Sequence, residues 1–421
     1  MKRTLLGLLV VSAAGLLITR EGASAERLSA AGAKRVAAVV TVYHHNSHAD
    51  VIVSRLLQTD TLDGKGRRPA LELVSLYTDQ VPTSDISRKL AAEHQVPIYP
   101  TVADALTLGT GKLAVDGVLL VAEHGNYERS PTGQVVYPKR RLFEQVVKVF
   151  ADSNRVVPVF VDKHLADNWT DAKWLYDTAR RMRIPIMAGS SLPVLWRYPP
   201  VDLERGAKLS EVVAVSYHTL DAYGFHALEM LQTIVERRSG GETGVKAVRC
   251  LVGNAVWKAG EQGVYDSELL AAAIARLKRP PPADRKLSEL VPEPVLFVID
   301  YADGLRASVL TLNGAVGEWG IAWRHAADRR VESTLFWTQE ARPLMHFTYL
   351  VNGIEEMMHT GRPTWPAERT LLTSGLLDAL LISKKEGGKR VETPYLTFSY
   401  RTDWTWHEPP PPPPGRPLDA Q

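Results

Sequence analysis

A lysine at the end of an apolar segment is the first residue of this sequence that suggests chemistry. Lys163 lies in the stretch Val-Phe-Val-Asp-Lys-His-Leu, residues 159–165, where a predicted strand passes into a helix. In open α/β proteins, ligands bind at the edge of the sheet where the strands end. Lys163 is therefore a candidate site residue, and the alternative is a solvated lysine in a loop.

Three histidines follow the first predicted strand and could bind an ion. Neutral imidazoles suit zinc or copper, but His44 and His45 are adjacent and point in different directions, and no carboxylate lies at a convincing ligand spacing from them or from His48. We therefore predict no metal site. Asn46 or Ser47 can instead cap a helix, and the N-terminus of such a helix can bind an anion.

Polar and aromatic residues also follow two later strands. His124 and Asn126 come directly after an apolar run, where they would contact a substrate or form a polar loop. Arg197 stands between two aromatic residues, an arrangement that suits a sugar or a carboxylate but also a packed domain hinge. Tyr217 begins the second domain. The candidate substrate contacts are His124, Asn126, Arg197 and Tyr217.

Positioning these residues requires strands whose ends meet, and the hydrophobic pattern predicts them. Between residues 35 and 205, apolar strand-like segments alternate with helix-like segments. This alternation predicts a Rossmann-like α/β domain, a doubly wound parallel sheet. The predicted strands are 35–43, 71–77, 96–99, 118–122, 156–161 and 184–188.

A second domain, residues 206–402, has a different pattern. Longer strand-like segments are joined by Gly turns such as Asp303-Gly304 and Asn313-Gly314. This pattern predicts an α+β domain with an open, largely antiparallel sheet. The predicted strands are 212–216, 245–252, 295–301, 306–312, 318–324, 332–338 and 395–400, and the predicted helices are 225–237, 347–359 and 369–383.

The two ends of the chain have their own signatures. Lys2 and Arg3, an apolar run over residues 5–18 and small residues before Glu26 predict a Sec-type signal peptide, 1–25, with cleavage after Ala25. Export to the periplasm or the medium follows, and an uncleaved N-terminal membrane anchor is the alternative. At the other end, residues 403–421 include a polyproline run that predicts a solvated tail, and the alternatives are a spacer or a ligand for a partner.

Composition excludes several classes of protein. The 421 residues carry 50 basic and 47 acidic side chains, a balance that does not indicate a nucleic-acid surface. The single cysteine, Cys250, excludes an intramolecular disulfide and a thiolate metal site, and it is most simply a buried apolar residue.

Several short motifs resemble those of one enzyme family. The two-domain order, Asp116–Ala122, Asp-Lys-His-Leu at 162–165, Gly-Phe-His at 224–226 and Tyr301–Arg306 resemble the glucose-fructose oxidoreductase, inositol dehydrogenase and MocA family (Gfo/Idh/MocA). The likeness extends from about residue 35 to residue 402.

This resemblance implies an NAD- or NADP-dependent oxidoreductase that acts on a sugar, a polyol or a related carbohydrate. Matched position by position, Lys163 and His226 would be the acid–base pair, since a hydride leaves carbon only as the adjacent hydroxyl loses a proton. The family also implies a homo-oligomer that pairs through the sheet of the second domain.

The loop that would hold the cofactor departs from the family. No glycine occurs between Gly32 and Gly64, so the Gly-x-Gly-x-x-Gly turn is absent and bulky residues 43–48 replace it. Asn46 and Ser47 would lie beside the phosphates, and Asp79 matches the acid that holds the ribose hydroxyls, although an Asp at a strand end is also a common turn residue.

Two functions remain open at this stage. The first is an exported enzyme that acts on a carbohydrate by hydride or proton transfer, with an altered dinucleotide site. The second is a non-catalytic carbohydrate-binding or scaffolding protein that has lost its cofactor, because a fold alone does not fix a function.

Overall fold

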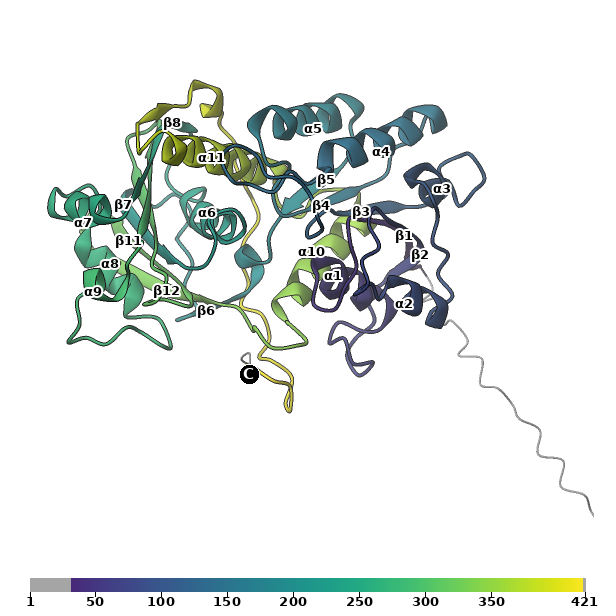
Figure 1. The fold of residues 1–421 in the computed structure, drawn as a ribbon, viewed down its shortest axis with the longest axis horizontal. Coiled ribbons are helices and arrows are strands. Elements are labelled where there is room, and N and C mark those ends of the chain that lie inside the picture. Colours follow the sequence, from purple (N-terminus) through teal and green to yellow (C-terminus); the bar gives the residue numbers. More distant parts are fainter. Residues whose placement is uncertain (1–31, 419–421) are drawn as a thin grey trace, which may run out of the picture.

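The computed structural model describes residues 32–418, and its first sheet has five parallel strands in the order β2-β1-β3-β4-β5 (Figure 1). Nearly every strand residue is buried, which explains the continuous apolar runs. The predicted parallel sheet is confirmed, and the predicted signal segment, 1–25, lies outside the described residues. The strands are β1 (Lys34–Val40), β2 (Leu71–Thr78), β3 (Gly117–Val121), β4 (Val159–Asp162) and β5 (Ile186–Gly189).

The strand predicted at residues 96–99 is wrong. Only a single bridge joins Ile98 to Leu76 at the edge of the sheet. Pro97 has no N–H and its carbonyl accepts a bond from the Leu76 amide at 3.0 Å, so the segment cannot continue a ladder of hydrogen bonds.

Helices cover both faces of this sheet. One face packs against α3 (Val102–Thr107), α4 (Lys139–Ser153) and α5 (Trp169–Met182). The other face packs against α1 (His48–Leu57), α2 (Ser87–Glu93) and α10 (His346–Thr360).

Helix α10 belongs to the part of the chain that we assigned to the second domain, yet it lies against the first sheet (Figure 1). Its apolar residues recur at helical spacing, including Phe347, Leu350, Val351 and Ile354, and they are buried in the same core as β1. The chain therefore returns to the first sheet after β12 and before β13, and α10 closes the core of the first sheet.

The second sheet has eight strands in the order β13-β8-β9-β10-β7-β11-β12-β6. Every pair is antiparallel except β10 with β7, so the predicted open, largely antiparallel sheet is confirmed. The strands are β6 (Trp196–Tyr198), β7 (Leu209–Ser216), β8 (Val245–Val252), β9 (Val295–Tyr301), β10 (Arg306–Thr311), β11 (Trp319–His325), β12 (Val331–Trp337) and β13 (Val391–Glu392).

The strand predicted at 395–400 is also wrong. A 3-10 helix (Pro394–Leu396) begins this segment, and only Tyr400 forms a bridge, with Glu242. Pro394 fixes its own φ angle and lacks an N–H, which favours a turn over a strand.

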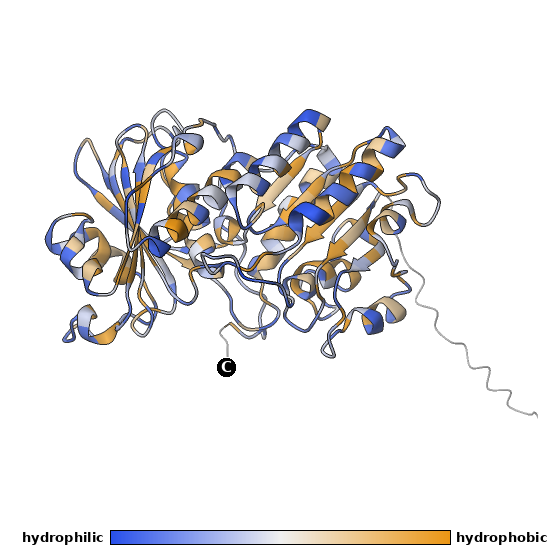
Figure 2. Ribbon diagram, turned by 45° about the horizontal axis from the view of Figure 1, so that its top comes forward, coloured by the Kyte–Doolittle hydropathy of each residue, from blue (hydrophilic) through white to orange (hydrophobic). Residues whose placement is uncertain are grey.

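The two faces of the second sheet have different covers (Figure 1). The inner face packs against α6 (Ala222–Val235) and α11 (Ala367–Lys385), and the outer face packs against α7 (Asn254–Glu261), α8 (Ser267–Ile274) and α9 (Leu287–Leu290). Figure 2 shows the apolar strands of both sheets beneath helices whose outward surfaces are polar. The outer helices bury much of the sheet that the resemblance assigns to an oligomer interface.

The C-terminal tail, residues 403–418, packs against the body of the protein instead of extending into solvent as predicted. Trp406 is buried, and its Nε1 donates to the Leu195 carbonyl at 2.8 Å. The carbonyl of Pro410 accepts bonds from Trp196 Nε1 and from the Tyr349 hydroxyl. The polyproline run thus supplies carbonyl acceptors to buried side chains, a role that its lack of N–H groups does not prevent.

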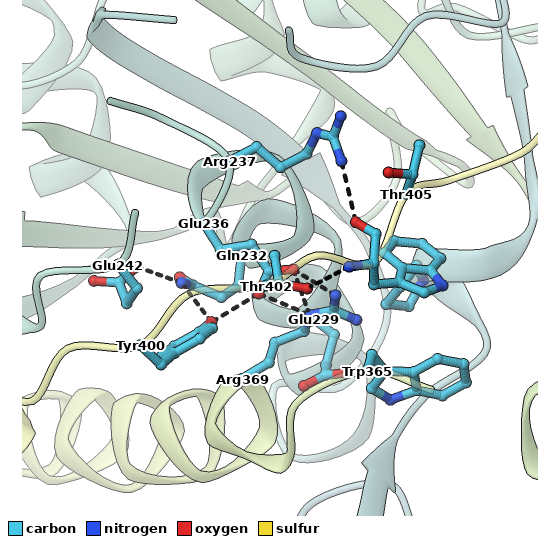
Figure 3. Close-up of polar contacts among 12 residues, drawn as sticks. Glu229, Gln232, Glu236, Arg237, Glu242, Trp365, Arg369, Tyr400, Thr402 and Thr405 are labelled. Atoms are coloured by element: carbon cyan, nitrogen blue, oxygen red, sulfur yellow. Dashed lines mark hydrogen bonds and ion pairs between the residues drawn. The ribbon is translucent and has the colours of Figure 1, made fainter. Parts of the chain in front are cut away.

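A buried polar network joins α6, α11 and the segment before the tail (Figure 3). Arg369 pairs with Glu236, and the Tyr400 hydroxyl donates to the same carboxylate at 2.8 Å. The Trp404 ring lies over the Arg369 guanidinium at 5.1 Å. These contacts fix the inner helices of the second sheet relative to the end of the chain.

Cys250 is buried and free, as predicted. Within residues 32–418, no helix combines the length and the apolar character needed to cross a bilayer.

Candidate functional site

The ends of β1, β3 and β4 bring a cluster of polar side chains to one edge of the first sheet. These three strands are neighbours in the sheet order, so residues far apart in sequence become adjacent. His48 follows β1, Glu123 and His124 follow β3, and Lys163 follows β4. α6 of the second domain brings His226 to the same region, since the neighbouring Phe225 ring contacts the His164 ring with centroids 5.4 Å apart.

A buried carboxylate lies at the centre of the cluster. Glu123 Oε2 lies 3.2 Å from Lys163 Nζ, and Glu123 Oε1 accepts a hydrogen bond from Lys139 Nζ at 2.8 Å. Lys139 also donates to the backbone carbonyls of Asp162 and His164. Lys139 is thus held by three oxygens, whereas Lys163 has the Glu123 carboxylate as its ion-pair partner.

The two lysines decide the ionisation of Glu123. Burial alone would raise the pKa of its carboxyl, but the ammonium groups of Lys139 and Lys163 outweigh that effect and hold the pKa well below its usual range. Glu123 is therefore a carboxylate at neutral pH.

A second pair, His48 and Asp162, lies beside the first. Nδ1 of His48 is 2.6 Å from Oδ2 of Asp162, and the carboxylate is almost fully buried while the imidazole is 13 % exposed. A carboxylate on Nδ1 fixes the ring orientation and leaves Nε2 to face a ligand. The pair has the arrangement of a base and the group that orients it.

Two further imidazoles are neutral and incompletely bonded. Burial, followed by repulsion from neighbouring groups that include the Lys163 ammonium, lowers the pKa of His124 to about 3. Burial and the charge of Lys163 also lower the pKa of His226 well below its usual value. Nε2 of His124 and Nδ1 of His226 are buried and have no hydrogen-bond partner among the described residues. A buried ring nitrogen without a partner is costly, and a ligand hydroxyl would satisfy it.

The backbone at the site is strained at two places. His124 and Lys163 have φ angles of 65° and 58°, in the left-handed region that residues with a Cβ rarely adopt. The Lys163 amide donates to the Gly189 carbonyl at 3.1 Å, which holds the strained turn in place. Such strain is concentrated at functional sites in proteins.

An aromatic group from the second domain borders His226. The rings of Tyr217 and Tyr223 both contact Trp319, with centroids 4.9 and 5.4 Å away, and the His226 ring lies 6.1 Å from the same tryptophan. Aromatic faces next to hydrogen-bonding groups suit the apolar face and the hydroxyls of a carbohydrate. Tyr217, predicted as a substrate contact, is therefore in this group.

The loop after β1 does not fit a dinucleotide. Ser47 caps α1 and accepts from the Asp50 amide, while the Asn46 amide donates to the Asp50 carboxylate at 2.8 Å. Arg342 pairs with this carboxylate at 2.7 Å. The Asn46 and Asp50 amides at the start of α1 are therefore bonded within the chain, and the Asp50 carboxylate beside them is paired with Arg342.

The hydrogen-bonding capacity of the Asp79 carboxylate is fully used within the protein. Its two oxygens accept hydrogen bonds from the hydroxyls of Tyr77 and Tyr127 and from Arg141, at 2.7–2.9 Å. Burial opposes ionisation, but the Arg141 guanidinium outweighs it and lowers the pKa of Asp79. These bonds occupy the lone pairs that would otherwise accept ribose hydroxyls.

Two predicted substrate contacts lie elsewhere. Asn126 is exposed. Its backbone N–H donates to the side-chain oxygen of Gln80, and its backbone carbonyl accepts from the side-chain nitrogen of Gln80. Arg197 is fully buried, pairs with Asp202 at 2.6 Å and lies against the Trp406 ring. Of the two interpretations that the sequence left open for Arg197, the structure favours the packed hinge.

Sequence reasoning missed Glu123 and Lys139 and did not connect His48 with Asp162. Glu123 could have been found, since it ends an apolar strand directly before His124, at the edge where ligands bind. Lys139 gave no signal, because it begins an ordinary amphipathic helix.

No protein-family model matches the sequence, and no curated protein matches it either. Solved structures share its fold. GenD2 from gentamicin A biosynthesis, in complex with NAD, is 14% identical with a TM-score of 0.53, covering 85% of this chain and 96% of that one. Scyllo-inositol dehydrogenase from Lactobacillus casei is 10% identical with a TM-score of 0.52, covering 85% and 98%. Myo-inositol 2-dehydrogenase from Lactobacillus plantarum is 11% identical with a TM-score of 0.51, covering 85% and 99%. The chain thus has the fold of the Gfo/Idh/MocA-type sugar and polyol dehydrogenases.

Proposed function

We propose that this protein binds a neutral, carbohydrate-like polyol between its two domains and transfers a proton at one of the polyol's hydroxyl groups. The observation that carries the proposal is the Lys163–Glu123 pair, 3.2 Å apart, beside the neutral ring of His226. Lys163 and His226 would contact the substrate, and His48, oriented by Asp162, would be the proton acceptor. The sugar and polyol dehydrogenases of the same fold support this substrate class.

The charge of the cluster supports a neutral ligand. Lys139 and Lys163 both pair with the Glu123 carboxylate, and the Asp162 carboxylate is bonded to His48, so two carboxylates accompany the two ammonium groups. A phosphate or carboxylate ligand would need an excess of positive charge at this place. Hydroxyl groups need only hydrogen-bond partners, and His124 and His226 each provide an unpaired ring nitrogen.

The chemistry follows from the same groups. A hydroxyl hydrogen-bonded to Nε2 of His48, the imidazole that Asp162 orients, gives up its proton to that nitrogen, and the electron pair stays on the oxygen. The Lys163 ammonium would stabilise the developing negative charge on that oxygen. The altered loop after β1 supports proton transfer over hydride transfer, because its amides are bonded to Asp50 instead of a pyrophosphate.

A second function is a non-catalytic carbohydrate-binding protein. The low pKa values of His124 and His226 favour it, because both rings then act as hydrogen-bonding groups and not as acids at neutral pH. We also propose that the N-terminal segment directs export of the chain. A freely exchanging dinucleotide would be scarce in the periplasm or the medium.

Calorimetric titration of the purified mature protein with myo-inositol, D-glucose, NAD and NADP tests the proposal. We expect a polyol to bind and neither dinucleotide to bind. Lys163→Met should weaken polyol binding at least about tenfold, because one charge-assisted hydrogen bond contributes about 1.5–3 kcal/mol. Lys148→Met, at an exposed lysine on α4, is the matched control and should leave it unchanged.

Each outcome separates the alternatives. Micromolar binding of NAD or NADP would overturn the exclusion of a dinucleotide. Equal polyol affinity in the parent and in Lys163→Met would remove Lys163 from the site. Binding that depends on Lys163, without conversion of any member of a broad panel of sugars and polyols, would favour the non-catalytic function.

A further inference from the structure

A cationic hollow lies on the outer face of the second sheet, away from the candidate site. It has a volume of about 430 Å³, and its lining includes Lys246 and Arg249 of β8, Asp300 of β9, Arg306 of β10 and Arg390, which directly precedes β13. The sheet separates the hollow from α6 and His226, because Val298 packs with the outer helices while Phe297 and Ile299 pack toward α6.

In each of three arginines of the hollow, some of the guanidinium N–H groups already form hydrogen bonds within the protein. Arg249 Nε donates to the Gly388 carbonyl at 2.7 Å, and Arg306 Nη1 donates to the Val264 carbonyl at 3.1 Å. Arg390 Nε donates to Glu392 at 2.8 Å, and its Nη1 pairs with Asp300. An anchored guanidinium loses little conformational entropy when its remaining N–H groups bind a ligand.

These side chains keep free donors. The Nη atoms of Arg249 and the Nε and Nη2 atoms of Arg306 have no hydrogen-bond partner within residues 32–418. The Lys246 side chain is exposed and has no ion-pair or hydrogen-bond partner in that range either. The hollow therefore presents preoriented N–H groups that water alone satisfies.

The balance of charge around the hollow is positive. Four cationic side chains line it against one carboxylate, Asp300, which Arg390 already engages. Glu392 also binds Arg390, and Glu211 lies near Arg306 from β7. Lys246, Arg249 and Arg306 are left without an ion-pair partner at 4 Å or less among the described residues.

We propose that this hollow binds a compact anion with a phosphate or sulfate ester, such as a phosphorylated or sulfated sugar. Guanidinium groups match the oxygens of such esters with two parallel hydrogen bonds, and several cations favour a multivalent anion. The volume suits a small molecule, since ligand sites span about 300–1,000 Å³. The same ester could belong to a soluble sugar or to a lipid headgroup.

A second copy of this chain is a poor occupant. In a two-fold dimer the same patch would face itself, and the like charges of Lys246, Arg249 and Arg306 would repel each other. Helices α7–α9 also cover the adjoining part of the outer face, so little apolar surface is left for a dimer.

Calorimetric titration of the full-length mature protein with tripolyphosphate and with glucose 6-phosphate tests the proposal. Flotation with vesicles that contain phosphatidylglycerol tests the lipid source. We expect at least one probe to bind, with an affinity that falls as salt rises. The double substitution Lys246→Glu and Arg249→Glu should weaken binding at least about tenfold, because it removes two cationic donors.

A charge-matched control distinguishes the hollow from the overall charge of the protein. Lys89→Glu and Lys148→Glu change two exposed lysines of the first domain and alter the net charge equally. An equal loss of affinity in this control would overturn the site, and so would a failure of all three probes to bind. A dimer in solution that dissociates only in the Lys246→Glu, Arg249→Glu variant would assign the surface to a second copy and also overturn it. Binding only to vesicles would assign the ester to a lipid.

Discussion

The Nζ atom of Lys163 lies 3.2 Å from Oε2 of Glu123, and the other oxygen of this carboxylate accepts a hydrogen bond from Lys139. One buried carboxylate is therefore the ion-pair partner of two buried or nearly buried ammonium groups. The arrangement links three positions that are separated in sequence but lie at the ends of adjacent strands or at the start of α4.

Replacing Glu123 should destabilise the protein more than replacing an exposed glutamate. Glu123→Gln leaves two ammonium groups without a counter-charge, and breaking a buried pair in this way costs about 3–5 kcal/mol of unfolding free energy. Urea unfolding followed by circular dichroism measures the loss. Glu144→Gln, at a half-exposed glutamate of α4, is the matched control and should cost much less. A loss below about 1 kcal/mol for Glu123→Gln would show that the pair is not buried as described.

Acid should destabilise the protein between about pH 6.5 and pH 3. Burial lowers the pKa of His164 and of His346 to about 3, so both stay neutral in the folded state while the unfolded chain takes up protons below its ordinary value of about 6.5. Because the unfolded state binds more protons, stability falls as pH falls through this window, by up to about 1.4 kcal/mol per pH unit for each histidine. The low pKa of Glu123 adds to this loss near the acid end.

A variant separates one histidine from the rest. His346→Phe should lower the slope of unfolding free energy against pH between pH 6 and pH 4. The decrease should be about 1.4 kcal/mol per pH unit, which corresponds to one proton fewer taken up on unfolding. Met345→Leu, at a buried neighbour that carries no proton, should keep the parent slope. Identical slopes in the parent and in His346→Phe would contradict the neutral state of this ring.

The sequence predicted the two sheets because strand burial leaves a pattern of apolar residues. Strands buried on both faces are continuous apolar runs, and those of the second domain are longer segments joined by Gly turns. It also made Lys163 and His226 candidate site residues, since both lie in motifs that resemble a family, and their role stays a prediction. Glu123 and Lys139 were missed because their pairing depends on the order of strands in the sheet, and a list of strands does not give that order. The helix α10 was predicted within the second domain for a related reason. The apolar face of an amphipathic helix does not show which sheet the helix packs against.

The C-terminal tail shows a different limit of sequence reasoning. A polyproline run predicts exposure because it cannot form regular secondary structure, yet its carbonyls remain acceptors. Trp404 and Trp406 precede the run and contact Arg369 and Arg197. These tryptophans were the signal that the segment would be buried.

Graded truncation tests the role of the tail. Ending the chain after Gly415 removes the Arg416–Asp63 ion pair and the Pro417 acceptor of Gln339, and we expect a loss of about 1 kcal/mol or less. Ending it after Thr402 also removes Trp404 and the buried Trp406, and the loss of a large buried side chain such as Trp406 costs about 3 kcal/mol or more. Thermal unfolding and tryptophan emission measure both variants. Equal stability of the two truncated chains would mean that the tail contributes nothing beyond its last contacts.

The pair of Arg369 and Glu236 offers a test of how the inner helices are held (Figure 3). Both side chains are buried, and Glu236 also accepts a hydrogen bond from Tyr400 at 2.8 Å. Arg369→Met leaves a buried carboxylate with that one donor, and the expected loss of unfolding free energy is about 3–5 kcal/mol. Adding Glu236→Gln removes the charge while keeping an acceptor for Tyr400, so the double variant should be more stable than Arg369→Met alone. A double-mutant cycle by urea unfolding gives the coupling. Additive losses would show that the two groups do not interact, and the junction between α6 and α11 would then depend on apolar packing.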